Sequence, residues 1–233
     1  MNDAKILLVD DDEELCQLLS DFLVRDGFGV DIANDGATAL RRAASENYDA
    51  LILDVMLPQR SGIEVLRELR RDSQLPVLML TALGEDIDRI LGLELGADDY
   101  VPKPCNPREI AARLRAILRR TRGESETARL ADLVVGPVAL NAASRSVALR
   151  DEPVSLTGTE FNILVMLMRD AGHVVSKETI AQDVLGRPLR PFDRSIDVHI
   201  SKLRRKLGVA ADGESLIHTI RRGGYLFRVV QEA

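Results

Sequence analysis

The 233-residue sequence contains no tryptophan, and only 3% of its residues are aromatic. Proteins that bind single-stranded nucleic acid stack the bases on aromatic side chains, so this scarcity argues against that mode of binding. The chain has two cysteines, and they lack the spacing of a metal site. We therefore expect reduced thiols in a cytosolic protein and no disulfide framework.

Long hydrophobic runs are missing too, since no apolar stretch approaches the roughly 20 residues that a membrane-spanning helix needs. The N-terminal stretch MNDAKILLVDDD lacks the basic residues that begin a signal peptide, and it turns acidic where such a peptide stays apolar. Hydrophobic residues nevertheless make up 45% of the chain, enough for globular cores. These features predict a cytoplasmic globular protein that does not insert into a membrane.

The net charge of −6 is distributed unevenly along the chain. Residues 1–121 contain 23 acidic and 15 basic residues, a net charge of −8, whereas residues 122–233 contain 14 and 16, a net charge of +2. Within residues 187–228, ten basic residues outnumber four acidic ones. An acidic half joined to a half with a basic C-terminal region indicates two domains with different partners.

The first half alternates between short apolar runs and amphipathic helical patterns. Strands are predicted at 6–9, 30–33, 50–54, 76–81 and 100–103, and a last helix at 108–120. Five strand–helix units predict an α/β fold with a doubly wound parallel sheet. The following stretch TRGESETAR is polar and aperiodic, which predicts a flexible linker. We therefore place a first domain at 1–121, a linker at 122–130 and a second domain at 131–233.

The second half has short strands and three predicted helices. DLVVGPVALN and SRSVALRDEPVSL indicate antiparallel strands, with turns at Asn141 and at 151–153. A capping-box pattern at 157–160 opens the first helix, the second runs from Ser176 to Gly186, and the third begins with Asp193 as N-cap and ends near Gly208. LIHTI and YLFRV flank RRGG as a hairpin. Three helices followed by a hairpin predict an α+β winged-helix domain.

Polar side chains stand at the carboxyl ends of four predicted strands of the first domain. They are Asp10, Asp11 and Asp12 after the first strand, and Asp54, Thr81 and Lys103 at the third, fourth and fifth. The carboxyl ends of parallel strands lie at one edge of a sheet, so we expect these side chains to share a site. From its position alone, Asp54 could equally be a turn residue or a site residue.

Carboxylates that lie close together repel one another unless a cation lies among them. Two or three carboxylates with a carbonyl and waters suit Mg²⁺, which also bridges to phosphate. Lys103 can offer a charge and Thr81 a hydroxyl to a phosphoryl oxygen, and an Asp carboxylate can itself accept a phosphoryl group. The strand ends therefore predict a magnesium-dependent phosphoryl site.

The spacing LLVDDD…ILDVMLP…LMLTA…GADDYVPKP resembles the receiver domain of two-component response regulators over residues 3–121. The resemblance implies a flavodoxin-like fold in which Asp54 is the phospho-acceptor. It implies Mg²⁺ ligands at Asp10, Asp11, Asp54 and the carbonyl of Met56. It also assigns Thr81 and Lys103 to the acyl phosphate, Tyr100 to an aromatic switch, and a cis bond to Lys103–Pro104. Cys105 stands where relatives carry Phe, and we interpret it as a smaller packing residue.

Two enzyme classes with similar strands fit less well. Haloacid-dehalogenase-type phosphatases carry a second Asp two residues after the nucleophile, where this chain has Met56. Dinucleotide-binding enzymes carry G-x-G-x-x-G in the first strand–helix turn, where this chain has VDDDEE.

The third helix of the second domain separates apolar from basic residues around a wheel of about 100° per residue. Ile196, Ile200, Leu203 and Leu207 form the predicted buried stripe, and His199 is expected near it. The opposite side carries Arg194, Val198, Ser201, Lys202 and Arg205, with Arg204 on the flank and Asp197 placed to orient an arginine. A basic outward face fits the DNA major groove, although a solvated basic surface would give the same pattern. The hairpin tip, Arg221 to Gly224, suits a phosphate backbone or a narrow minor groove.

The pattern LTGTEFNIL…GHVVSKETI…DRSIDVHISKLRRKLG…IRRGGYLF resembles the winged-helix effector of OmpR/PhoB-type regulators over residues 131–230. The resemblance implies DNA contacts by Arg194, Ser201, Lys202, Arg204, Arg205 and Arg221, and an approach of loop 185–192 to RNA polymerase. It also implies a dimer face with ion pairs of Arg89 with Glu109 and of Asp99 with Arg113. Within this family, LGRPLRPFDRSIDVHIS is most similar to CpxR-type regulators.

These features together predict a phosphorylation-activated transcriptional regulator. A sensor histidine kinase would supply the phosphoryl group to Asp54, and phosphorylation would promote homodimerisation and binding to double-stranded promoter DNA. The chain would not be an enzyme, apart from slow self-dephosphorylation. Two alternatives stay open: a stand-alone aspartyl-phosphate hydrolase, which lacks an obvious water-activating acid beyond the metal ligands, and a DNA-binding regulator that works without phosphorylation.

Overall fold

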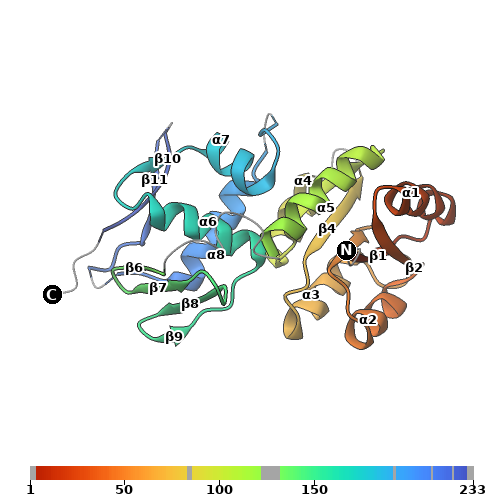
Figure 1. The fold of residues 1–233 in the computed structure, drawn as a ribbon, viewed down its shortest axis with the longest axis horizontal. Helices are drawn as coiled ribbons and strands as arrows, with labels where there is room; N and C mark the ends of the chain where they lie inside the picture. The colour runs from red at the N-terminus through yellow and green to blue at the C-terminus, as the bar shows by residue number, and fades with distance from the viewer. Residues whose placement is uncertain are drawn as a thin grey trace. The chain divides into compact units, whose positions relative to one another are not determined.

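The structure is a computed structural model that describes residues 4–82, 86–121, 132–190, 193–210, 212–221 and 223–229. The chain divides into an N-terminal unit, Met1–Leu118, and a C-terminal unit, Arg119–Ala233 (Figure 1). The predicted linker at 122–130 lies outside the described residues.

The N-terminal unit alternates strands with helices, as the sequence predicts. Its elements are β1 (Ala4–Val9), α1 (Glu13–Arg25), β2 (Phe28–Ala33), α2 (Gly36–Ser45), β3 (Ala50–Asp54), α3 (Gly62–Asp72), β4 (Val77–Ala82), α4 (Asp86–Leu95), β5 (Asp99–Lys103) and α5 (Pro107–Thr121). The strands pair in parallel in the order β2-β1-β3-β4-β5. This order confirms the predicted flavodoxin-like fold, and all five strands end within two residues of their predicted limits.

Both faces of this sheet are covered, which explains the nearly continuous apolar runs of its strands. Side chains alternate between the two faces of a strand, so neighbouring residues enter different layers. One layer packs under α1 and α5 and contains Ile6, Leu8, Ile52, Leu78, Leu80 and Val101. The residues between them, such as Leu7, Leu53 and Met79, point to the other face and are equally buried.

The C-terminal unit consists of two small sheets and three helical segments. Its elements are β6 (Leu133–Val135), β7 (Val138–Asn141), β8 (Ser146–Leu149), β9 (Glu152–Pro153), α6 (Gly158–Arg169), β10 (Val174–Val175), α7 (Lys177–Ile180) continued by a π-helical turn (Ala181–Leu185), α8 (Ser195–Leu207), β11 (Ile217–Ile220) and β12 (Gly224–Phe227). Strands β6 to β9 form an antiparallel meander, and β12 lies between β10 and β11. This arrangement confirms the predicted winged helix.

Two local predictions in this unit, the turn at 152–153 and the N-cap of α8, are wrong. Glu152 and Pro153 form strand β9, because Arg150 and Asp151 complete the preceding turn with positive φ angles of 50° and 67°, as a two-residue hairpin turn requires. The predicted hairpin is confirmed, because β11 and β12 pair antiparallel, and Val174–Val175 adds a third strand to it. The N-cap of α8 is Arg194 instead of Asp193, although an Asp193 oxygen accepts a hydrogen bond from the backbone N–H of Ser195 at 2.9 Å.

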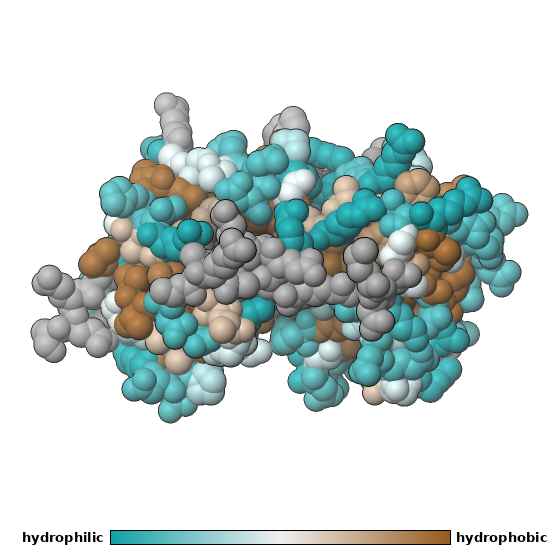
Figure 2. Space-filling model, viewed as in Figure 1, coloured by the Kyte–Doolittle hydropathy of each residue, from teal (hydrophilic) through white to brown (hydrophobic). Residues whose placement is uncertain are grey.

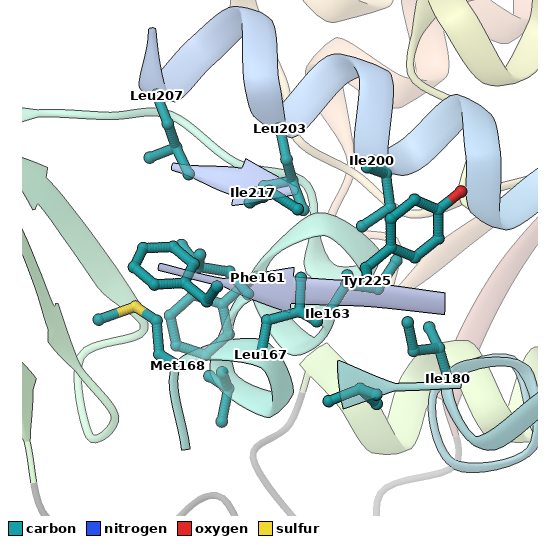
Figure 3. Packing of buried hydrophobic residues seen from close by; sticks show 14 of the residues in the cluster. Phe161, Ile163, Leu167, Met168, Ile180, Ile200, Leu203, Leu207, Ile217 and Tyr225 are labelled. Carbon is teal, nitrogen blue, oxygen red and sulfur yellow. The ribbon is translucent and has the colours of Figure 1, made fainter. Parts of the chain in front are cut away.

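The core of the C-terminal unit gathers side chains from all of its helices (Figure 3). The predicted stripe of α8 is confirmed, because Ile196, Ile200, Leu203 and Leu207 are each at most 1% exposed. In Figure 3 the last three of these point from α8 towards Phe161 and Leu167 of α6 and Ile217 of β11. The apolar stripe therefore fixes which side of α8 remains for contacts outside the unit.

The surface drawn in Figure 2 is mostly hydrophilic, with smaller apolar patches between the polar residues. Among the residues that the structure describes, no helix combines the length and the apolar character needed to cross a bilayer.

A buried carboxylate joins α6 to α8. The Thr157 side chain and the Glu160 carboxylate form the predicted capping box at the start of α6. Glu160 also receives Lys202 at 3.0 Å and Lys206 at 2.6 Å from α8. Burial by itself would raise the Glu160 pKa, but the two ammonium groups outweigh it and lower the pKa to about 2.

We expect Glu160 to make the C-terminal unit sensitive to acid. Its pKa is lower in the folded chain than the ordinary value of 4.5, so its stabilisation is present above about pH 4.5 and is lost as the pH falls towards 2. The size of this contribution is about 3 kcal/mol. Calorimetric unfolding between pH 2 and 7 should show a flatter pH dependence for Glu160→Gln, together with lower stability at pH 7. The exposed Glu178 provides the matched control, and a Glu178→Gln profile equal to that of Glu160→Gln would contradict the assignment.

Candidate functional site

The acidic crevice, defined here by Asp10, Asp11, Asp54 and Lys103, lies where the strand order of the N-terminal sheet reverses. Strands β1 and β3 are neighbours, and the chain proceeds outward from them in opposite directions. In sheets of this kind the helices that follow the two strands leave on opposite faces, so a crevice forms at their carboxyl ends. Asp10 follows β1 and Asp54 ends β3, which places both carboxylates at this point.

The structure brings the predicted charged residues together. Ligand oxygens of Asp10, Asp11 and Asp54 lie within 4.8 Å of one another. Asp10 and Asp54 are buried, whereas Asp11 is exposed. From the end of β5, the Lys103 ammonium lies 2.7 Å from Asp10 Oδ2 and 3.0 Å from Asp54 Oδ1. Asp12 has a different role, because it accepts a hydrogen bond from Leu15 N–H as the N-cap of α1.

Burial and neighbouring charges shift the pKa values of Asp54 and Lys103. Burial raises the pKa of Asp54, the negative charge of Asp10 raises it further, and Lys103 and the Met56 N–H oppose the shift. Burial would lower the Lys103 pKa, but its two carboxylate partners outweigh that and raise it. Lys103 therefore stays protonated between two acids that would otherwise repel.

The donor set of the crevice fits a divalent cation of the magnesium type. Three carboxylates and one ammonium leave two negative charges, and hard oxygen donors are what Mg²⁺ prefers. Two of the three donors are buried on strand ends while the third faces solvent, so an ion could keep several waters. Asp10, Asp11 and Asp54 could thus hold Mg²⁺ together, and the role of the Met56 carbonyl stays a prediction.

Two residues that the sequence analysis did not single out, Asn34 and Cys16, help to hold Asp10 in place. Its backbone carbonyl accepts hydrogen bonds from the Asn34 amide at 3.3 Å and the Cys16 thiol at 3.4 Å. Its Oδ1 accepts one from the N–H of Asp12 at 3.1 Å. Burial raises the pKa of the Cys16 thiol to about 12, so this cysteine acts as a neutral donor. No sequence pattern points to Asn34 or Cys16, because their contacts with the Asp10 carbonyl join the end of β2 and α1 to the end of β1.

Gly62 supports Asp54 from the start of α3. A Cβ atom at this position would lie 1.9 Å from the backbone oxygen of Asp54. The Gly62 N–H also donates to the Val55 carbonyl at 2.9 Å. The absence of a side chain therefore lets α3 approach the end of β3 and fixes the loop that follows the acceptor.

Thr81 and Tyr100, which the resemblance assigns to the phosphate contact and the switch, lie in the neighbouring strands β4 and β5. Thr81 is fully buried in β4 and Tyr100 is 3% exposed in β5. The Lys103–Pro104 bond is cis, as predicted. Cys105 packs at the edge of the core under α1 and α5, in line with its interpretation as a packing residue. The switch role of Thr81 and Tyr100 stays a prediction.

The predicted dimer-face residues make ion pairs within the chain. Arg113 donates to Asp99 at 2.6 Å and forms a second ion pair with Glu109 one helical turn earlier. Asp99 and Arg113 are 1% and 5% exposed. Arg89 lies outside the residues whose side chains the structure describes. A pairing of these residues across a dimer would thus have to replace or extend the pairs already present.

The outward face of α8 is smaller than the helical wheel predicts. Arg194, Ser201 and Arg205 are exposed, as is Arg221 at the hairpin. The prediction that Lys202 and Val198 face outward is wrong, since they are only 4% and 6% exposed. The long side chain of Lys202 bends back to the buried Glu160, which makes a DNA contact by Lys202 incompatible with this conformation.

The remaining polar residues of α8 contact neighbouring elements. Arg204 is half-buried and donates to the Ile217 carbonyl of β11 at 2.8 Å. Asp197 accepts hydrogen bonds from Lys177 and Tyr225, so the expectation that it orients an arginine is wrong. The expectation of a buried His199 is confirmed.

A doubly wound sheet with an acidic crevice, joined to a winged helix with a basic helix face, is the architecture of DNA-binding response regulators. Family models match residues 6–115 to the response regulator receiver domain and residues 151–227 to the C-terminal domain of transcriptional regulatory proteins. The chain therefore belongs to the OmpR/PhoB-type response regulators and is a transcriptional regulatory protein with a DNA-binding domain.

Individual relatives agree with this family. The transcriptional regulatory protein CpxR of Klebsiella pneumoniae is 50% identical over 226 residues, which cover 95% of this chain and 97% of that protein. The structure of a RitR mutant has a TM-score of 0.76 at 26% identity and covers 99% of this chain and 100% of its own. DrrB of Thermotoga maritima, an OmpR/PhoB homologue, has a TM-score of 0.51 at 31% identity, with 97% and 99% covered. The chain is thus CpxR-like over nearly its whole length.

Substitution of Gly62 should damage the acidic crevice. In Gly62→Ala the new Cβ would meet the Asp54 carbonyl, so β3 and α3 must separate, and we expect a loss of about 1–3 kcal/mol of stability. Mg²⁺ affinity, measured by titration calorimetry, should fall with it because Asp54 moves.

The control for this variant is Gly92→Ala in α4. A Cβ there would find its nearest neighbour at 3.5 Å, and alanine favours a helix interior over glycine by about 0.5–1 kcal/mol. Unchanged Mg²⁺ binding by Gly62→Ala would show that Asp54 does not depend on this contact.

Proposed function

We propose that this protein takes up a phosphoryl group on Asp54 from a sensor histidine kinase and, once phosphorylated, dimerises and binds promoter DNA. The observation that supports the proposal best is the crevice itself. It places a buried carboxylate at a strand end, 3.0 Å from a protonated lysine and beside two further acids that fit Mg²⁺.

The crevice residues have distinct roles in this proposal. An oxygen of Asp54 attacks the phosphorus atom of the kinase phosphohistidine, and the phosphorus–nitrogen bond breaks as the new phosphorus–oxygen bond forms. Asp10, Asp11, Asp54 and the Met56 carbonyl would hold Mg²⁺, which neutralises the phosphoryl oxygens. Lys103 would exchange its contact with the Asp54 carboxylate for one with a phosphoryl oxygen, and Thr81 would donate its hydroxyl to another.

The signal would then reach the β5–α5 face. The phosphoryl group adds roughly 1.5–2 negative charges next to Lys103. Thr81 and Tyr100, on the neighbouring strands β4 and β5, would respond to it. Asp99 precedes Tyr100 in the sequence and holds Arg113 of α5 in an ion pair. Exposed ion pairs are worth only about 0–1 kcal/mol each, so dimerisation through Arg89, Asp99, Glu109 and Arg113 would also need apolar contacts.

The DNA contacts would come from the exposed basic residues of the C-terminal unit. Arg194, Ser201 and Arg205 on α8 face away from the apolar stripe and suit the major groove. Arg221 on the hairpin suits a phosphate or the minor groove. Arg204 would contact DNA only from the flank, because β11 already holds its guanidinium group. Loop 185–192, part of which lies outside the described residues, would face RNA polymerase in the cytoplasm.

The phosphorylation step can be tested by intact mass. After incubation with acetyl phosphate and Mg²⁺, we expect one phosphoryl adduct on the wild-type chain and none on Asp54→Ala. Light scattering should show a shift from monomer to dimer only for the chain with the adduct. The matched control, Asp21→Ala on the exposed side of α1, should behave like the wild type. DNA binding that stays the same in Asp54→Ala and in the phosphorylated wild type would support a regulator that works without phosphorylation.

The DNA contacts can be tested by salt dependence. Each phosphate contact contributes about 0.9 to the slope of log affinity against log salt concentration. We expect Arg194→Ala and Arg221→Ala to lower the slope of the full chain by about that amount when binding to a duplex selected from a random pool. Arg150→Ala, an exposed arginine of the β8–β9 turn, is the control and should leave the slope unchanged. Equal slopes for all three variants would count against these contacts.

A further inference from the structure

A carboxylate in the first turn of α8 joins three elements of the C-terminal unit. Asp197 accepts a hydrogen bond from the Tyr225 hydroxyl of β12. The same oxygen accepts the ammonium of Lys177, at the start of α7, at 2.6 Å. Figure 3 shows the Tyr225 ring inside the core with its hydroxyl directed towards α8. Asp197 therefore ties the beginning of α8 to the hairpin formed by β11 and β12.

A second contact ties the end of α8 to the same hairpin. In the last turn of the helix, Arg204 donates from Nε to the Ile217 carbonyl at 2.8 Å and from Nη2 to the Thr219 hydroxyl at 2.7 Å. Both acceptors belong to β11. The guanidinium carbon also lies 5.9 Å from the centre of the Tyr225 ring.

The register of the hairpin places the two contacts opposite each other. Thr219 pairs with Tyr225 across the antiparallel strands, and directly opposite residues project to the same face of a sheet. On its other side, Tyr225 pairs with Val175 of β10, two residues before Lys177. Thr219 and Tyr225, the two side chains that α8 contacts, are therefore directly opposite each other in the sheet.

We propose that Asp197, Tyr225 and Arg204 are positioning residues that fix the hairpin against α8, so that the helix and the hairpin tip bind DNA as one preformed unit. This inference rests on the proposed DNA contacts of α8 and Arg221. A hairpin that is already fixed against α8 raises the affinity for DNA, because no conformational entropy has to be lost to order the hairpin when the helix binds. None of the three residues needs to touch DNA for this effect.

The test uses Tyr225→Phe in the full chain, which removes one hydroxyl and keeps the ring in the core. Hydrogen exchange of the free protein should show faster exchange in β11 and β12 with unchanged exchange in the middle of α8. On a duplex selected from a random pool by the wild type, hydroxyl-radical protection of the hairpin's minor-groove site should need about tenfold more protein. Methylation protection of major-groove guanines should be lost much less.

The salt slope separates positioning from direct contact. We expect Tyr225→Phe to keep the slope of the wild type, since no phosphate contact is removed. A slope lower by about 0.9 would mean that Tyr225 itself contacts a phosphate and would overturn the inference. So would a parallel loss of major-groove and minor-groove protection, which is what a general loss of folded protein produces.

A second variant and a matched control complete the design. Thr219→Val removes the hydroxyl that accepts a hydrogen bond from Arg204, and Thr219 is exposed, so the inference stays testable if Tyr225→Phe folds poorly. This variant should also show faster exchange in β11 and β12 and weaker protection of the minor-groove site. The matched control is Tyr48→Phe, which removes a hydroxyl that donates to Asp31 and Glu46 in the N-terminal unit. It should change neither the exchange of β11 and β12 nor the protection of the DNA.

The outcomes distinguish this inference from the proposed function. If Arg194→Ala and Arg221→Ala leave the salt slope unchanged, the proposed DNA contacts fail, while the exchange data still report the attachment of the hairpin. If those variants behave as expected but Tyr225→Phe and Thr219→Val match the wild type in exchange and protection, only the positioning role is wrong.

Discussion

The ammonium of Lys103 between the carboxylates of Asp10 and Asp54 is the contact on which the acidic crevice depends. Without a cation at this point, two buried acids at neighbouring strand ends would repel, and at least one would take up a proton. The lysine holds an oxygen of Asp10 and an oxygen of Asp54 near each other, in an arrangement that can receive Mg²⁺ and a phosphoryl group. The parallel sheet supplies the placement, since it brings the ends of β1, β3 and β5 to one edge.

The C-terminal unit uses the same electrostatic device for a different purpose. Its acids, Glu160 and Asp197, each hold cations that belong to or surround α8. Glu160 takes the ammonium groups of Lys202 and Lys206 to attach the helix to α6, and Asp197 attaches it to α7 and β12. A positive charge on α8 is therefore not by itself a sign of DNA contact, because part of that charge stabilises the unit that presents the helix.

The accuracy of the sequence-based predictions follows the range of the interactions involved. The strands of the N-terminal unit were predictable because burial on both faces gives each one a continuous apolar run, and the capping box of α6 because it joins residues only three apart. The wheel of α8 identified the buried stripe but misplaced Lys202. A wheel gives the direction of a Cα–Cβ bond, whereas a lysine has four further bonds with which to reach a distant acid.

The sequence alone determined the two-domain order, the parallel sheet with its acidic edge, and the winged helix with a basic helix, since each depends on local periodicity or on residues at strand ends. Only the tertiary structure decided which of these side chains are available. Asn34 and Cys16 meet the Asp10 carbonyl from separate elements, Gly62 leaves room for the Asp54 backbone, and Glu160 withdraws Lys202 from the outward face of α8. Such contacts join residues far apart in the chain, and their energies depend on burial, which arises only when the elements pack together.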